Sequence, residues 1–70
     1  MLLIYAPINQ EFKIIKILAN VKVKKHLEDL GILPNGTITL LSVNGGNVIC
    51  LTKNVRLALD KITASKILVA

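Results

Sequence analysis

The chain has 70 residues, of which 53% are hydrophobic and 3% aromatic, and nine Lys and Arg against four Asp and Glu give a formal net charge of +5. This length predicts one domain over residues 1–70, because chains divide into several domains only at much greater length. The single cysteine, Cys50, excludes an internal disulfide and fits a reducing compartment, so we expect a cytoplasmic protein.

The sequence also excludes a membrane-spanning helix, although its mean hydropathy of +0.63 is high. A spanning helix needs about 20 mostly apolar residues, and the longest apolar run, Met1–Ala6, ends at Pro7. No basic residue precedes this run, so we do not expect a signal peptide. The sequence assigns Met1–Ala6 no structural role.

The first two predicted elements are a strand and a helix. The isoleucine-rich segment Glu11–Leu18 is typical of a strand, and the pattern changes over Lys22–Leu30, where apolar residues take helical spacing. Asn20 is suited to cap the start of this helix, and Gly31 to end it, with Pro34 just beyond. The helical spacing is that of Val23, Leu27 and Leu30.

A bent strand and a hairpin are predicted next. In Thr37–Val43 the apolar phase switches at Leu40–Leu41, which indicates a strand that bends, as small barrels require. Asn44–Asn47 reads Asn-Gly-Gly-Asn, a strong hairpin signal, and Val48–Thr52 is the predicted return strand.

The last third predicts a strand, a helical turn and a closing strand. Over Val55–Asp60 apolar and other residues alternate, so we expect three side chains to point into the core and Arg56 to point outward. Asp60 can cap a turn over Lys61–Ser65, and Lys66–Val69 is a final short strand. The three inward residues are Val55, Leu57 and Leu59.

Together these elements predict a mainly β fold, a small SH3-like barrel of about five antiparallel strands with one short α-helix after the first strand. Without long crossovers the strands should form a meander. An OB-type barrel is the main alternative, although its helix usually comes between later strands.

Catalysis is poorly supported, so we expect a protein that is not an enzyme. Nucleophilic catalysis needs a nucleophile beside a base, but Cys50 lies in an apolar run and His26 on the predicted helix. Glu28 and Asp29 are neighbours and point about 100° apart on a helix, so they do not form a catalytic carboxylate pair.

A metal site within one chain is not expected either. Transition metals take three or four ligands, and His26 and Cys50 are only weak candidates that would need further ligands from a neighbouring chain. We therefore predict no firm cofactor, with ferrous iron or another divalent transition metal as the open alternative, and His26 as a surface residue.

The basic start of the helix is the one unusual feature. Lys22, Lys24 and Lys25 occupy the end of the helix where its dipole disfavours cations. They are either a solvated face or a surface that binds an acidic partner. With the outward Arg56 they are the candidate partner-binding residues.

We do not expect nucleic acid as the partner, despite the positive charge. Binding of single strands relies on aromatic stacking, and Tyr5 and Phe12 are the only aromatic residues, Phe12 with the pattern of a core residue.

From Lys24 onward the sequence resembles the FeoA family, small cytoplasmic accessory proteins of bacterial ferrous-iron transport. The resemblance begins with a helix ending in Leu-x-x-Leu-Gly, here Leu27–Gly31, followed by Ile32-Leu33-Pro34 and the strand from Thr37. It continues through the Gly45-Gly46 hairpin and the segment Arg56–Lys61 to the closing strand. Where the family commonly has Gly, this chain has Asn35 and Asn54, and Asn is the other residue suited to the left-handed conformation.

This resemblance implies an SH3-like barrel that acts with FeoB, the membrane permease with a cytoplasmic GTP-binding domain. Modulation of nucleotide hydrolysis, stabilisation of the transporter and metal sensing stay open as molecular roles. One alternative is the metal-responsive regulatory domain found in some metal-dependent repressors, disfavoured by the lack of DNA-binding helices in a chain that we expect to be complete. The other is a small basic nucleic-acid-binding barrel.

Overall fold

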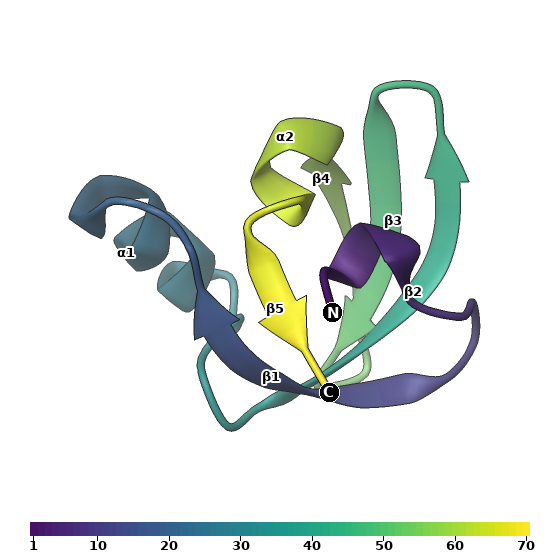
Figure 1. Cartoon of the computed structure of the whole chain (residues 1–70), viewed down its shortest axis with the longest axis horizontal. Coiled ribbons are helices and arrows are strands. Elements are labelled where there is room, and N and C mark those ends of the chain that lie inside the picture. Colours follow the sequence, from purple (N-terminus) through teal and green to yellow (C-terminus); the bar gives the residue numbers. More distant parts are fainter.

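The computed structural model describes residues 1–70 as five antiparallel strands in the order β4-β3-β2-β1-β5, with short helices at their ends (Figure 1). This confirms the mainly β fold with an α-helix after the first strand. The elements are η1 (Leu3–Tyr5), β1 (Glu11–Ile17), α1 (Val21–Asp29), β2 (Thr37–Asn44), β3 (Asn47–Thr52), β4 (Val55–Asp60), α2 (Lys61–Ala64) and β5 (Ile67–Val69). Neither α-helix is long and apolar enough to cross a bilayer.

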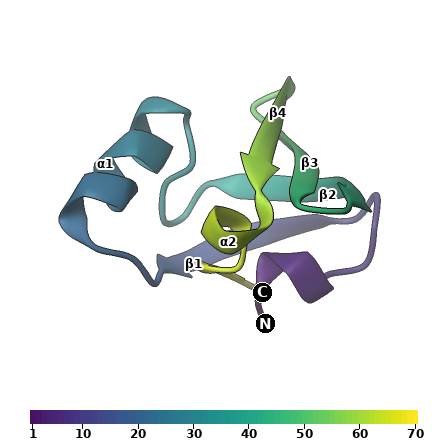
Figure 2. The same cartoon turned by 90° about the horizontal axis from the view of Figure 1, so that it is seen from above.

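The predicted meander is correct for four strands and wrong for the last. Strands β1 to β4 pair in sequence, but β5 pairs with β1 instead of β4. The turn of α2 carries the chain across the end of the barrel, so the last strand lies beside the first (Figures 1 and 2). The sheet thus curls around a core of 14 buried apolar residues drawn from all parts of the chain.

The apolar N-terminus is part of this core, a role that the sequence did not indicate. Leu3 and Ala6 are buried, and η1 lies against the end of the barrel near α2. The N-terminal amino group donates to the carbonyl of Val69 at 2.9 Å, and the Val69 amide donates to the carbonyl of Met1 at 2.7 Å. The first residues therefore cover the outer edge of β5.

Two β-bulges bend the sheet. In β2 the pairing with β3 shifts between Leu40 and Ser42, which confirms the bend predicted from the change of apolar phase. In β1 the pairing with β5 shifts between Ile14 and Lys16, so that Ile15 is an extra residue. This second bulge was not predicted, and its extra residue, Ile15, lines a groove beside α1.

Asparagine supplies several of the left-handed backbone conformations that the turns require. Asn35 has φ 72° and Asn54 φ 64°, as expected where the family commonly has Gly. Asn54 follows Lys53 at φ 50°, so both central residues of the β3–β4 turn have positive φ, as in a type I′ hairpin. The β2–β3 hairpin has positive φ at Gly45.

Strand β4 was predicted correctly in extent but only partly in burial. Leu59 is buried and Arg56 is exposed, as expected, whereas Leu57 is half-buried and Val55 is 54% exposed. The reason is that β4 is an edge strand, and its first residues lie beside a turn where no element covers them. Phe12 is also only partly buried, although it packs against the core as expected.

Helix α2 begins at the predicted cap, Asp60, whose Oδ1 accepts a hydrogen bond from the Thr63 amide at 2.6 Å. That bond to the carboxylate holds the pKa of Asp60 below its ordinary value of 3.8. Because the pKa of Asp60 is lower in the folded protein than in the unfolded chain, its carboxylate stabilises the fold at pH values above the ordinary pKa. This contribution is lost as the pH falls through the pKa of Asp60 in the folded protein.

We therefore expect the wild type to lose more stability than Asp60→Asn between about pH 5 and pH 2. The amide variant keeps an oxygen to accept the Thr63 hydrogen bond but has no charge to titrate. Urea unfolding followed by circular dichroism at several pH values measures the difference. Equal acid sensitivity of the two proteins would show that Asp60 does not contribute.

Candidate docking groove beside helix α1

Helix α1 stands to one side of the barrel (Figures 1 and 2). Local hydrogen bonds fix both of its ends. Asn20 caps the start as predicted, since its Oδ1 accepts from the Val23 amide at 2.9 Å. At the end, Gly31 has φ +88°, and the amides of Gly31 and Ile32 donate to the carbonyls of Glu28 and Leu27. This is a Schellman motif, and it directs the chain back towards the sheet.

The segment after α1 is tied to β1. The Asn35 amide donates to the carbonyl of Ile14, and the Ile14 amide donates to the carbonyl of Gly36, both at 2.8 Å. Leu27 and Ile32 are fully buried beneath the junction. The helix and the following loop are thereby held at a fixed distance from β1.

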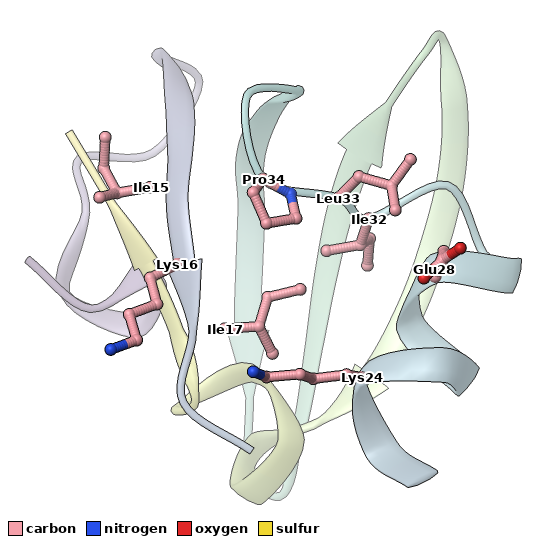
Figure 3. A pocket seen from close by; sticks show the side chains of 8 residues that line it. All are labelled: Ile15, Lys16, Ile17, Lys24, Glu28, Ile32, Leu33 and Pro34. Atoms are coloured by element: carbon pink, nitrogen blue, oxygen red, sulfur yellow. The ribbon is translucent and has the colours of Figure 1, made fainter. Parts of the chain in front are cut away.

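A groove with a volume of about 280 Å³ lies between α1, this loop and β1 (Figure 3). Ile17 from β1 and the side chains of Ile32 and Pro34 point into it, while Lys24 and Glu28 border it on the helix side. The lining residues are Ile15, Lys16, Ile17, Lys24, Glu28, Ile32, Leu33 and Pro34.

The bulge in β1 places an exposed apolar residue at the edge of this groove. As the extra residue, Ile15 is released from the alternation of the strand, and its side chain is 48% exposed although both Ile14 and Ile17 are buried. Leu18 and Val21, at 48% and 81% exposure, follow in the connection to α1 and at its first residue. Exposed apolar residues thus follow the groove-lining segment along the chain up to the start of the helix.

The structure separates the predicted basic residues. All are exposed, but at about 100° per residue Lys24 lies about 200° around the helix from Lys22. Lys24 borders the groove, Lys22 lies on the opposite flank, and Lys25, about 100° from Lys24, is not among the lining residues. Arg56 lies on β4, at the other end of the strand order from β5 and β1. Of the four candidates, only Lys24 lines the groove.

The two weak metal candidates are not part of any ligand cluster. His26 is exposed on α1, whereas Cys50 is fully buried in β3, where burial raises the pKa of its thiol to about 11. Nowhere does the fold gather three or more His, Cys, Asp or Glu side chains that could hold a metal ion. The donor set therefore does not fit a resident metal within one chain.

We accordingly expect the monomer to bind ferrous iron or zinc no more tightly than an isolated surface histidine does, because three convergent ligands are needed for a tight site. Anaerobic calorimetric titration measures this directly, with His26→Ala as the control. A stoichiometric submicromolar site on the monomer would contradict the prediction.

Sequence reasoning missed most of the groove. Ile15, Leu33 and Pro34 were not singled out as surface residues, although the Ile14-Ile15 doublet, which breaks the alternation of the strand, was a visible signal. A doublet alone does not tell which of the two residues a bulge will expose. The pairing of β1 with β5 decides it.

Comparison with known proteins places this architecture in a family. An NMR structure of an FeoA-like protein from Clostridium acetobutylicum is similar at TM-score 0.82 and 27% identity, over 97% of this chain and 81% of that one. A crystal structure of an iron uptake regulatory protein, FeoA, gives TM-score 0.89 at 23% identity, over 99% and 93%. FeoA from Chlorobium tepidum gives 0.88 at 20% identity, over 99% and 68%. No curated protein matches the sequence. The FeoA domain model matches residues 1–70, and the chain therefore belongs to the FeoA domain family.

Proposed function

We propose that this protein is a non-catalytic accessory protein of ferrous-iron uptake that docks on the cytoplasmic part of an FeoB-type GTP-binding permease. The observation that carries the proposal is the FeoA family match across residues 1–70. The family resemblance implies the permease as partner and the cytoplasm as the place of action.

The chemistry of the side chains supports docking over catalysis. The only thiol, that of Cys50, has a pKa of about 11 because it is buried, so it carries almost no thiolate at neutral pH. His26 is exposed on α1, and one oxygen of Asp60 accepts the Thr63 amide hydrogen. A nucleophile with an adjacent base is not among these groups.

The surface supports an acidic protein as the partner. The net charge of +5 favours association with anionic surfaces, and α1 presents lysines on both of its flanks. Of the two aromatic residues, Tyr5 is 74% exposed and Phe12 packs against the core. Only one aromatic side chain is therefore exposed for stacking with nucleic-acid bases, whereas binding of single strands usually relies on several.

Uptake of radioactive ferrous iron by anaerobic host cells tests the proposal. Cells that lack the chain should take up iron more slowly at equal permease level, and the wild-type chain supplied in trans should restore the rate. An unchanged initial rate, with the permease confirmed by immunoblot, would contradict the function. A change in permease transcript level alone would instead favour the regulatory alternative.

A further inference from the structure

The geometry points to a specific ligand for the groove between α1 and β1. We propose that it receives a short segment of the permease's cytoplasmic part that carries a branched aliphatic side chain beside an Asp or Glu. This inference rests on the proposed function, and it adds the place of docking and the kind of segment that docks.

The apolar interior of the groove calls for an apolar side chain. Ile17 and Ile32, both buried, form its floor, Leu33 and Pro34 line it on the side of the loop, and Ile15 stands at its β1 edge. At about 280 Å³ it lies at the lower end of the range of about 300–1,000 Å³ for pockets that hold drug-sized ligands. It therefore suits one or two side chains of a peptide better than a nucleotide or an organic cofactor.

The exposed residues around the groove extend the contact surface. Val21 precedes Lys24 and Glu28 by three and seven residues, so all three lie along the flank of α1 that borders the groove. Val21, Leu18 and Ile15 are exposed aliphatic side chains that follow one another from the helix start to β1. Three exposed aliphatic side chains this close in sequence to an apolar groove favour an interaction site there.

The charged border specifies the acidic residue and its position. Figure 3 shows Lys24 reaching from α1 across the groove towards Ile17, whereas Glu28 stands on the same helix nearer to Ile32 and Leu33. Lys16 lines the β1 side, with its amino group directed away from the groove. A carboxylate is thus favoured near Lys24 and disfavoured near Glu28, which orients the bound segment along the groove.

The charge of the protein favours this partner over a second copy of the chain. Two copies that each carry +5 repel one another. The chain has only four acidic residues, and its one adjacent acidic pair, Glu28-Asp29, lies on α1 itself. The aliphatic residues that adjoin an Asp or Glu in this chain, Leu27, Leu30 and Leu59, are buried or half-buried. A copy therefore offers no exposed aliphatic side chain directly beside an acidic residue for the groove of another.

Binding of the purified cytoplasmic part of the permease to the isotope-labelled chain tests the proposal by NMR and calorimetry. Amide shifts should change most at Ile15, Ile17 and Leu33. Lys24→Glu and Ile15→Asn should each weaken binding about tenfold or more. The matched controls are Lys61→Glu, with the same charge change at an exposed residue of α2, and Ile62→Asn, at the exposed residue that follows it. The controls should stay within about twofold of the wild type.

Each outcome bears on a different part of the account. If the permease part binds but the shifts and affinity losses lie elsewhere, the groove assignment is wrong and the proposed function stands. If the wild type does not bind at all, both fail together. Groove shifts that depend only on protein concentration would overturn the assignment in favour of self-association. Lys24→Glu keeps the test valid even if Ile15→Asn folds poorly, because Lys24 is exposed and an acidic residue suits the start of a helix.

Discussion

Leu27→Ala should lower the free energy of unfolding by about 2–5 kcal/mol, a large part of the stability of so small a domain. Leu27 is the one fully buried residue of α1, and its carbonyl also accepts the Ile32 amide that closes the helix. Its removal leaves a cavity between helix and barrel. We expect α1 to loosen and the groove to lose its helix-side border.

Urea unfolding gives the free energy, and hydrogen exchange of the α1 amides shows whether the helix loosens more than the sheet. Val21→Ala on the same helix is the matched control, because Val21 is 81% exposed and should change stability by no more than about 0.5 kcal/mol. A loss below about 1 kcal/mol for Leu27→Ala would mean that α1 is not held by this contact.

Gly31→Ala should cost about 1–2 kcal/mol, for a reason that is conformational and not steric. Gly31 has φ +88°, a backbone conformation that is costly for a residue with a Cβ. Space is not the obstacle, since a Cβ at this position would lie 3.9 Å from the Cδ of Lys53, an ordinary contact. The same urea unfolding measures the cost.

Gly31→Asn provides a control that the chain itself suggests. Asn already occupies positive φ at Asn9, Asn35 and Asn54, and it tolerates the left-handed region better than Ala does. The Asn variant should therefore be more stable than the Ala variant. Equal losses for the two would point to packing of the side chain against Lys53 and not to the backbone.

Elements with explicit local signals were predictable from the sequence. Helix α1 begins and ends within one residue of its predicted bounds because Asn20 and Gly31 carry the hydrogen-bonding and conformational properties of caps. Asp60 marks the start of α2 in the same way. The alternation in β4 gave the strand, but the exposure of Val55 depends on the edge position of that strand, which no local pattern encodes.

Features that depend on distant pairing were not predictable. The bulge at Ile15 exists because β1 pairs with β5, which is the last strand of the chain. The role of Met1–Ala6 likewise depends on the two hydrogen bonds between Met1 and Val69, at opposite ends of the chain. The groove is built from the bulge and the loop after α1 together, so its members were visible only as separate apolar residues. Lys24 was proposed as a partner-binding residue for its charge alone, and only the fold shows that it lines the groove whereas Lys22 and Lys25 do not.

The most direct test of an accessory role at the permease is the rate at which the chain associates with the permease's cytoplasmic part at several salt concentrations. If α1 steers docking, the wild-type rate should fall as salt rises, because the screening length is about 8 Å at physiological ionic strength. The variant with Lys22, Lys24 and Lys25 changed to Gln should associate more slowly and with a flatter salt dependence, while its thermal stability holds or rises slightly. Absence of wild-type association would contradict the account, as would binding to generic oligonucleotides at physiological salt that the same variant abolishes.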